Sequence, residues 1–315
     1  MNRRHVLLLT YGEPPEAEFA RQFAYSWRIL FGLTRRVAPI PALVVPLIAF
    51  NRARMRTAQW RQESYHSPIE ALTAAQAKQV AGALRELAPN VDWSVQVAYE
   101  FRKPLLEDVL AALPAGEPTA VVPMYLANSE FTHEMARGKV RLLVDAGRPV
   151  SVVPALDPEV LADLSARHIE AELAKRNLAP GNGWALVLAA HGTLITPPRP
   201  METGRIGTTQ VAEGIARRLA PRFGRVVWGW LNHVMGGEWT SPPADRAIQD
   251  LAAEGYRKVV YFPYGFLADN AETQLEGRIA LRSAPGLERT EHLPCLNDSP
   301  DLARALAQAV IAAAN

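Results

Sequence analysis

A histidine at the end of an apolar run is the residue of this sequence best suited to acid–base or metal chemistry. His191 directly follows the apolar run 186–190 and is followed by Gly192. A short apolar run bounded by glycines is typical of a buried parallel strand, and open α/β sheets bind ligands beyond the carboxyl ends of such strands. A neutral imidazole there can bind a divalent metal or accept a proton near neutral pH. A purely structural histidine is the alternative.

Two glutamates after a second strand-like run can serve the same chemistry. The run 259–264 leads into a helix pattern that carries Asp269, Glu272 and Glu276. Glu272 and Glu276 are four residues apart and share one helix face, where two like charges favour a cation or a proton path. We expect His191 and Glu272, which both follow strand ends of one half, to form a pair, with Glu276 as a further metal ligand. The alternative is a solvated acidic face that begins with Asp269 as the helix cap.

The composition limits the classes of protein that this chain can represent. Its 315 residues, 49% of them hydrophobic, are enough for two domains with separate cores. A formal net charge of +2 gives no reason to expect nucleic acid as a partner. Cys295 is the single cysteine, which excludes internal disulfides and a Cys-rich zinc or iron–sulfur site built by this chain. No apolar stretch reaches the roughly 18–20 residues of a membrane span, and a cytoplasmic location is expected.

Strand and helix patterns alternate along the whole chain, which predicts βαβ units and parallel sheets. Strands are expected over 5–10, 95–98, 120–125, 150–154, 184–191, 225–230, 259–264 and 291–293. Helices are expected over 16–33, 67–84, 104–113, 134–145, 157–176, 207–219, 241–255, 269–281 and 299–313. The prediction is an α/β fold of two similar doubly wound domains, 1–154 and 155–315, each with a mostly parallel sheet flanked by helices and a cleft between them.

The uncharged segment 37–50 contains three prolines and lies between clusters of arginine. It is either a buried irregular connection or an exposed apolar lip that covers a large apolar ligand or touches a membrane surface. Pro41 and Pro46 argue against one continuous helix. We refer to residues 37–50 as the apolar segment.

Aromatic and basic side chains elsewhere fit a flat, acidic ligand. Trp228, Trp230 and Trp239 either pack in the core or form a wall for a planar aromatic molecule. Arginines 28, 52, 54 and 56 are either solvated surface residues or partners for ligand carboxylates.

Several short motifs occur in an order that matches one known family. His191 after its apolar strand resembles Ser-Ala-His-Ser-Leu-Pro, and residues 239–242 resemble Pro-Trp-Leu-Gly-Pro. Residues 265–273 resemble Gly-Phe-x-x-Asp-His-x-Glu-Thr, residues 296–300 resemble Leu-Asn-x-x-Pro, and Ser67 with its following proline resembles Gly-Gly-Ser-Pro. Together these motifs resemble the ferrochelatases, which insert ferrous iron into a porphyrin in haem synthesis.

The resemblance implies a site and a reaction. His191 and Glu272 would bind the incoming iron or take the two pyrrole protons, and Tyr11 would lie over the opposite face of a bent porphyrin. Tyr11 in the first strand turn favours coproporphyrin III over protoporphyrin IX, and Arg28 resembles a propionate-binding arginine. Ferrous iron is then a substrate, with no organic cofactor and no iron–sulfur cluster. The substrate-binding residues expected on this basis are Tyr11, Arg28, Ser67, His133 and Trp239.

The sequence also departs from the family pattern. Gly192 replaces a serine, Asn270 a histidine, and Tyr65 with its neighbour a pair of glycines. A protoporphyrin IX ferrochelatase, a cobalt or nickel chelatase of another tetrapyrrole, and a non-catalytic porphyrin or haem carrier remain as alternatives. The expected partner is a porphyrin. Transient contact with a membrane or with neighbouring haem-pathway enzymes, and a peripheral membrane location, are further options.

Overall fold

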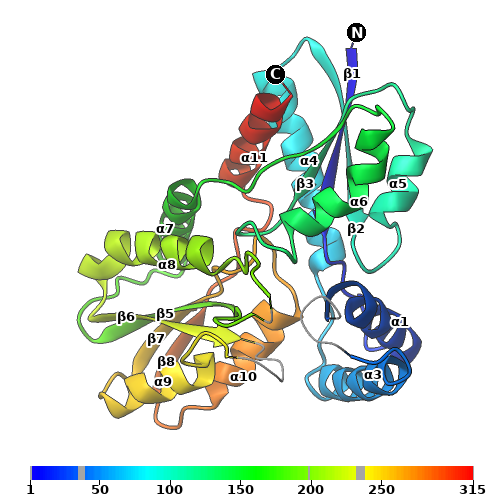
Figure 1. The fold of residues 1–315 in the computed structure, drawn as a ribbon. Helices are drawn as coiled ribbons and strands as arrows, with labels where there is room; N and C mark the ends of the chain where they lie inside the picture. The colour runs from blue at the N-terminus through cyan, green and yellow to red at the C-terminus, as the bar shows by residue number, and fades with distance from the viewer. Residues whose placement is uncertain (1, 35–39, 198, 232–237, 315) are drawn as a thin grey trace.

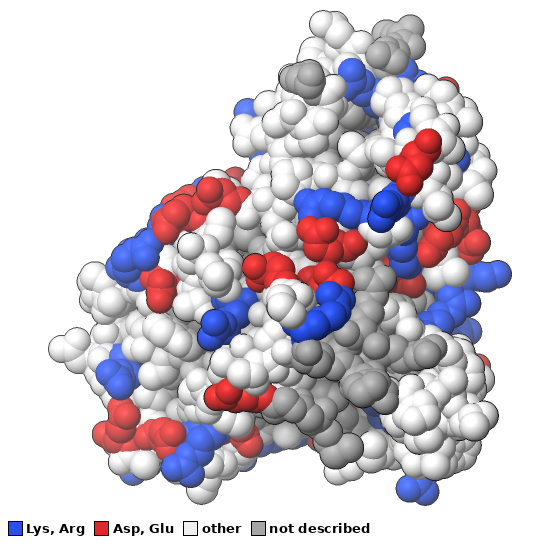
Figure 2. Space-filling model, in the orientation of Figure 1, with Lys and Arg blue, Asp and Glu red and all other residues white. Residues whose placement is uncertain are grey.

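The chain forms two halves, each built around a four-stranded parallel sheet (Figure 1). A computed structural model describes residues 2–34, 40–197, 199–231 and 238–314. In the space-filling view, positive and negative side chains are interspersed over the described part of the visible face (Figure 2).

The first sheet has the strand order β2-β1-β3-β4. Its strands are β1 (Asn2–Thr10), β2 (Val91–Tyr99), β3 (Thr119–Pro123) and β4 (Val150–Val152). Strand β1 is central and pairs in parallel with both β2 and β3. The run Leu7–Leu9 is fully buried, as expected of an apolar strand with helices on both faces of its sheet.

The second sheet repeats this arrangement in the order β6-β5-β7-β8. Its strands are β5 (Trp184–His191), β6 (Arg225–Leu231), β7 (Lys258–Phe262) and β8 (Arg289–His292). The central strand β5 is buried from Ala185 to Ala190 and ends at His191. The prediction of two similar α/β units with parallel sheets is therefore confirmed.

Helices cover both faces of each sheet. They are α4 (Ile69–Leu87), α5 (Leu106–Ala112), α6 (His133–Asp145), α7 (Pro158–Lys175), α8 (Arg205–Leu219), α9 (Ala244–Ala253), α10 (Gly277–Arg282) and α11 (Pro300–Ala313), and the 3-10 turn η2 (Ala220–Arg222) follows α8. Helices α5 and α6 cover one face of the first sheet, and α9 and α10 cover one face of the second. The remaining faces share one apolar cluster, which contains Val6 and Leu8 of β1 as well as Leu186 and Leu188 of β5.

The last helix of the chain lies against the first half. Helix α11 packs beside α4, and Arg4 of β1 donates a hydrogen bond to the carbonyl of Ala314 at 3.0 Å (Figure 1). The division of the chain at residues 154 and 155 stays a prediction.

In the described part of the apolar segment most side chains are exposed, and those of Val45 and Ala49 are buried. It follows α1 (Phe19–Ile29) and the π-helical turn η1 (Leu30–Thr34), and its residues 37–39 lie outside the described residues. Helix α3 (Val45–Gln62) begins within it and has Pro46 in its first turn, a place where proline is tolerated. The side chains of Val45 and Ala49 are buried against Leu30, whereas Leu43 is 93% exposed and Leu47 is 61% exposed. The described part of the segment is thus mostly exposed apolar surface, and its role as a lip over a ligand or against a membrane stays a prediction.

Candidate active site

The structure brings His191 and Glu272 into direct contact. His191 is the last residue of β5, and Glu272 is the second residue of the π-helical turn η3 (Ala271–Glu276), which follows β7. Nδ1 of His191 lies 2.8 Å from Oε1 of Glu272, a hydrogen-bond distance, and the side chains are 44% and 12% exposed. The two residues predicted to act together therefore form one pair at the carboxyl edge of the second sheet.

The carboxylate changes the proton affinity of the imidazole. Burial, the largest influence, lowers the pKa of His191, but the negative charge and hydrogen bond of Glu272, with the charge of Glu276, raise it overall above its ordinary value. Arg52 opposes this rise through its positive charge. His191 can thus hold a proton at a higher pH than an isolated histidine can.

A glycine lets the two strand ends approach each other. The N–H of Gly265, after β7, donates to the carbonyl of Ala189 in β5 at 3.2 Å. A Cβ on Gly265 would lie 2.6 Å from Cα of Ala190, so any larger residue would push the segment away from β5. Gly265 therefore allows the approach that brings Glu272 to His191.

Asn270 is the cap of η3. Its side-chain oxygen accepts the N–H groups of Glu272 at 2.9 Å and Thr273 at 3.3 Å, and Thr273 Oγ1 accepts the N–H of Asn270. The alternative in which Asp269 caps this helix is wrong, because Asp269 is buried and instead accepts the backbone N–H of Cys295 at 3.0 Å. Asn270, which replaces a histidine of the family motif, thus has a structural role at the start of the helix.

Glu276 is the last residue of η3, and its environment changes its own pKa. Burial and then the negative charge of Glu272 raise the pKa of Glu276 to about 7. Among the described residues, no group of three or more His, Cys, Asp and Glu side chains is arranged to hold a metal ion. The role of Glu276 as a further metal ligand stays a prediction.

Tyr11 lies beyond the end of β1, the strand of the first half that corresponds to β5. Gly12 follows at φ +73°, and a Cβ there would lie 2.5 Å from the ring of Tyr99, so this turn requires glycine. The Tyr11 ring lies 4.6 Å from that of Tyr125, between centroids, and its hydroxyl donates to the carbonyl of Phe131 at 3.3 Å. Burial first, and then nearby charges that include Glu272, raise the pKa of Tyr11. The charge of Glu272, in the second half, is the smallest of these influences.

Arg28 of α1 borders a cavity of about 380 Å³ in the first half. The cavity also has aromatic walls and contains Lys139, which is paired with Glu100 at 2.5 Å and Glu107 at 3.1 Å. No carboxylate in the described part of the chain forms an ion pair with Arg28. Its guanidinium is thus available to a ligand carboxylate in a way that Lys139 is not.

Ser67 and His133 both contact protein groups. Ser67 Oγ donates to Glu13 Oε1 at 2.5 Å. His133 is fully buried at the start of α6, and burial first, followed by the charge of Arg137, lowers its pKa to about 4. His133 is therefore neutral at neutral pH. The assignment of these two residues to porphyrin binding stays a prediction.

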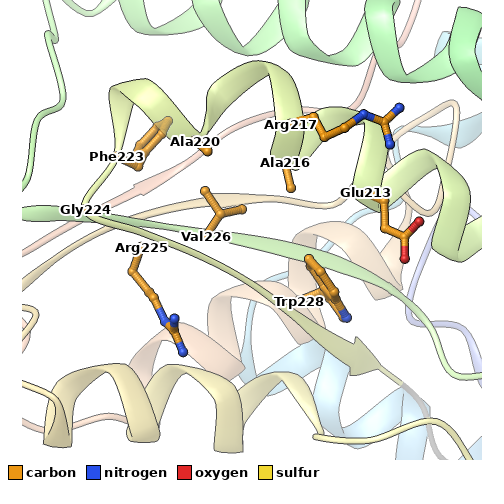
Figure 3. A pocket seen from close by; sticks show the side chains of 9 residues that line it. All are labelled: Glu213, Ala216, Arg217, Ala220, Phe223, Gly224, Arg225, Val226 and Trp228. Carbon is orange, nitrogen blue, oxygen red and sulfur yellow. The ribbon is translucent and has the colours of Figure 1, made fainter.

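The three tryptophans do not form one wall. Trp239 bridges to Leu194, in the loop that follows His191, while Trp230 is buried in the shared core. Trp228 lines a separate cavity of about 620 Å³ between β6 and α8 (Figure 3). None of the predicted site residues lines that cavity. The core-packing interpretation is confirmed for Trp230, and Trp239 pairs with the loop that follows His191.

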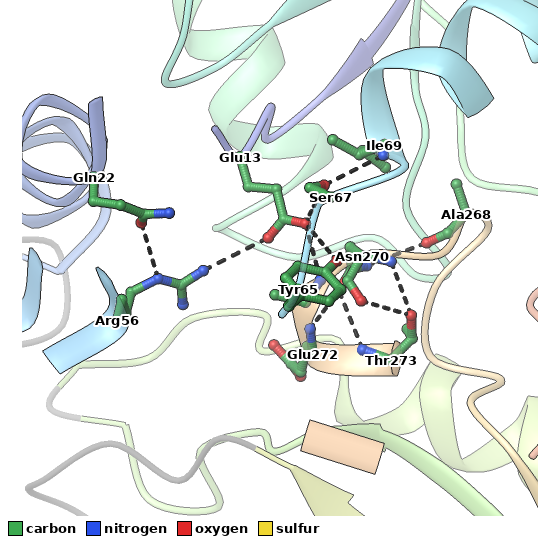
Figure 4. A network of polar contacts seen from close by, with 11 residues as sticks. Glu13, Gln22, Arg56, Tyr65, Ser67, Ile69, Ala268, Asn270, Glu272 and Thr273 are labelled. Atoms are coloured by element: carbon green, nitrogen blue, oxygen red, sulfur yellow. Dashed lines mark hydrogen bonds and ion pairs between the residues drawn. The ribbon is translucent and has the colours of Figure 1, made fainter. Parts of the chain in front are cut away.

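Sequence reasoning assigned no role to Glu13. This carboxylate accepts hydrogen bonds from Tyr65 and Ser67 of the first half (Figure 4) and from the backbone N–H of Ala271 of the second half, the last at 2.9 Å. Its only signal in the sequence is its position in the turn after Tyr11. Because its partners are up to 258 residues away, no local pattern indicates them.

The chain has a two-lobed α/β fold that solved structures of other proteins share. The chain is similar to the solved structure of CbiX, described as the terminal enzyme for biosynthesis of siroheme in denitrifying bacteria, with a TM-score of 0.56, 18% identity, and coverage of 98% of this chain and 99% of that one. It is also similar to SirB from Bacillus subtilis with Fe³⁺, with a TM-score of 0.51, 12% identity, and coverage of 99% and 96%. At these identities the likeness concerns the fold alone.

Sequence comparison then gives the family. Residues 3–314 match the family model for ferrochelatase, so the chain belongs to the ferrochelatase family. It is 26% identical over 333 residues to the ferrochelatase of a Cyanothece species, covering 99% of this chain and 83% of the relative. It is 27% identical over 322 residues to that of Bradyrhizobium diazoefficiens, covering 93% and 88%. The chain is therefore a metal chelatase of the lyase class, and the family's reaction inserts iron, as a substrate, into a tetrapyrrole.

The described helices were compared with the length and hydropathy that a membrane-spanning helix needs. None of them is both long and apolar enough to cross a bilayer.

Proposed function

We propose that this chain inserts ferrous iron into coproporphyrin III, with release of two protons, in haem biosynthesis. In this proposal the porphyrin binds between the halves, covered by the apolar segment. His191 and Glu272 act on one face of the ring and Tyr11 lies over the other.

The observation that carries the proposal is the 2.8 Å contact between His191 and Glu272 at the carboxyl edge of the second sheet. Metal insertion requires two pyrrole N–H protons to leave as the iron enters. An imidazole beside a carboxylate can accept such a proton, because the carboxylate stabilises the imidazolium that forms. The same pair of donor types, one nitrogen and one oxygen, suits ferrous iron on its way into the ring.

The choice of coproporphyrin III is supported by residues of the first half. Arg28 borders the cavity of about 380 Å³ together with Trp27, Phe31 and Phe101. An arginine can bind a carboxylate through two parallel hydrogen bonds, and aromatic rings provide a flat apolar wall. Coproporphyrin III carries more carboxylate side chains than protoporphyrin IX and therefore benefits more from this arginine.

An anaerobic insertion assay with ferrous iron and each porphyrin tests the proposal. We expect kcat/KM to be about tenfold higher for coproporphyrin III, the factor that one additional charge-assisted hydrogen bond provides. Equal use of both porphyrins, or preference for protoporphyrin IX, would contradict the substrate assignment. Insertion of cobalt or nickel but not iron would indicate a different chelatase, and porphyrin binding without turnover would indicate a carrier.

The location of the enzyme forms part of the same proposal. The exposed side chains of Leu43 and Leu47 offer apolar surface on the apolar segment. We propose a cytoplasmic enzyme that uses this surface for transient contact with a membrane or with a neighbouring enzyme of the haem pathway.

A further inference from the structure

Glu13 lies where the turn after β1 meets the start of η3 (Figure 4). It is 7% exposed, and a buried carboxylate destabilises a protein unless hydrogen bonds and opposite charge compensate for it. Its Oε1 accepts hydrogen bonds from Ser67 Oγ at 2.5 Å and from the hydroxyl of Tyr65 at 3.3 Å. The backbone N–H of Ala271 donates to the same oxygen at 2.9 Å, and Oε2 lies 3.6 Å from Arg56 Nη2. Groups from three separate segments of the chain thus compensate for the burial of the Glu13 carboxylate.

The hydrogen bond from Ala271 fixes the first residue of η3. The first N–H groups of a helix have no partner inside it and need one from outside. Asn270 provides an acceptor for the second and third N–H groups, those of Glu272 and Thr273, and Glu13 provides the acceptor for the first. Because Ala271 directly precedes Glu272, a side chain of the first half helps to set the backbone position of Glu272.

The same carboxylate connects η3 to the helix that continues the apolar segment. Arg56 of α3 pairs with Glu13, donates from Nε to Gln22 Oε1 at 3.3 Å, and lies 5.3 Å from the ring centroid of Trp60. Trp60 packs in turn against Tyr65, with ring centroids 4.7 Å apart and the rings nearly perpendicular. Trp60 and Tyr65 share an apolar cluster with Ala271 and Leu275 of η3. Helix α3 and η3 are therefore joined by both polar and apolar contacts.

One departure from the family pattern belongs to this arrangement. Tyr65 stands where the resembling motif has glycine, and its hydroxyl is one of the donors to Glu13. A glycine could supply neither this hydroxyl nor the ring that packs on Trp60. Tyr65 therefore helps to hold Glu13 in place.

We propose that Glu13 is a positioning residue for metal insertion, holding η3 through the N–H of Ala271 so that Glu272 stays in contact with His191. The role of Glu272 in this statement rests on the proposed function, whereas the effect of Glu13 on η3 does not. Glu13 acts through the backbone and contacts neither the iron nor the ring.

The decisive variant removes the acceptor without leaving a buried charge. In Glu13→Leu/Arg56→Met both members of the ion pair become apolar, a replacement that is often neutral or stabilising. Glu13→Gln keeps a side-chain oxygen that can accept from Ala271. Glu172→Leu is the matched control, because Glu172 is equally buried and ion-paired but lies on α7. Glu13→Ala takes the place of the double variant should that variant not fold.

Hydrogen exchange measured by mass spectrometry on the full chain gives the first readout. We expect peptides covering 269–277 to exchange about tenfold faster in Glu13→Leu/Arg56→Met, the factor for losing one hydrogen bond to a charged group. Glu13→Gln and Glu172→Leu should exchange in this region as the wild type does. Unchanged exchange in the double variant would overturn the proposal, whatever reaction the wild type catalyses.

Steady-state iron insertion gives the second readout. We expect kcat to fall about 10–100-fold in the double variant, as for other residues that orient a metal-site ligand, with KM for the porphyrin unchanged. Glu13→Gln should recover most of kcat. An equal loss in Glu13→Gln would show that charge alone matters and would overturn the proposal. A wild type that inserts no iron would instead count against the proposed function, and hydrogen exchange would still decide the role of Glu13.

Discussion

The two halves of the molecule share one strand order but carry different chemistry at corresponding strand ends. Central strand β5 ends in His191, which contacts Glu272, whereas central strand β1 leads to Tyr11, which is packed among aromatic rings. The pair of His191 and Glu272 is therefore on the second half, and the aromatic rings around Tyr11 and the cavity that Arg28 borders are on the first. A fold supplies equivalent edges, and the residues placed there decide what each edge does. We interpret the second half as the proton and metal half and the first as the ring-binding half.

The largest expected effect is loss of the pair. We expect His191→Ala and Glu272→Gln each to lower kcat about 10³-fold, within the range for a positioned acid–base group, and the double variant to be no slower than the slower single variant. Anaerobic iron insertion under saturating porphyrin measures this. His66→Ala, which changes an exposed histidine of the first half, is the control. Additive losses in the double variant would show that the two residues do not work as a unit.

The next effect is a pH dependence of stability that comes from His133 in the first half. Burial lowers the pKa of His133 to about 4, so as the pH falls below 6.5 the unfolded chain gains a proton that the folded chain does not. The contribution of His133 to the free energy of unfolding is therefore fully present above pH 6.5 and declines as the pH falls toward 4. We expect a loss of about 2 kcal/mol between pH 6.5 and 5. Urea unfolding of the wild type and of His133→Gln at pH 7 and pH 5 measures this. A pH dependence that is the same in both proteins would contradict the structural role of His133.

His191 should respond to pH in the opposite direction. Its pKa is raised overall, against the lowering effect of burial, by the carboxylates of Glu272 and Glu276, with Arg52 opposing. A base must be unprotonated to act, so the acid limb of kcat/KM should lie above the ordinary histidine value. Removal of one carboxylate charge in Glu272→Gln should move that limb to lower pH. An acid limb at the same pH in both proteins would assign it to another group.

A smaller effect is expected for the arginine of the ring-binding half. Arg28→Gln should raise KM for coproporphyrin III about tenfold, the value of one charge-assisted hydrogen bond, with little change in kcat. Arg21→Gln is the matched control, because Arg21 is exposed on the same helix and is paired with Glu18. A loss of kcat instead of an increase in KM would move Arg28 from ring binding to the chemistry.

The smallest effect concerns the exposed face of the apolar segment. Leu47→Ser should weaken porphyrin binding by a few-fold without lowering the melting temperature, because Leu47 is 61% exposed and adds little to the core. Ala49→Ser, at a fully buried position of the same helix, is the comparison and should lower it. A reduced melting temperature in Leu47→Ser would show that its side chain contributes to the fold.

Local patterns were sufficient to predict that His191 and Glu272 lie together. Apolar runs that end in glycine indicated strands β5 and β7, and the position of His191 and Glu272 after those runs indicated the pair that the structure brings together. The alternation of strands and helices likewise predicted both sheets and their parallel direction. These features depend on residues close together in the chain, where periodicity and turn chemistry act.

Contacts between residues far apart in the chain could not be predicted from local sequence patterns. The hydrogen bond from Ala271 to Glu13 joins residues 258 positions apart, and α11 packs on α4 although the two helices lie near opposite ends of the chain. The helix expected over 269–281 begins at Ala271, because Asn270 rather than Asp269 provides its cap, and it is a π-helical turn followed by α10. The residue at which a helix starts and the helix on which it packs depend on tertiary contacts, which can override local preference.

The most direct test of this division of roles measures binding and insertion on one sample of Glu272→Gln. Fluorescence titration gives the Kd for coproporphyrin III, and anaerobic addition of ferrous iron to the bound complex gives the single-turnover rate of insertion. We expect a Kd equal to that of the wild type and an insertion rate about 10³-fold lower. Wild-type insertion, or a loss of porphyrin binding in place of a loss of rate, would contradict the assignment of the chemistry to the second half.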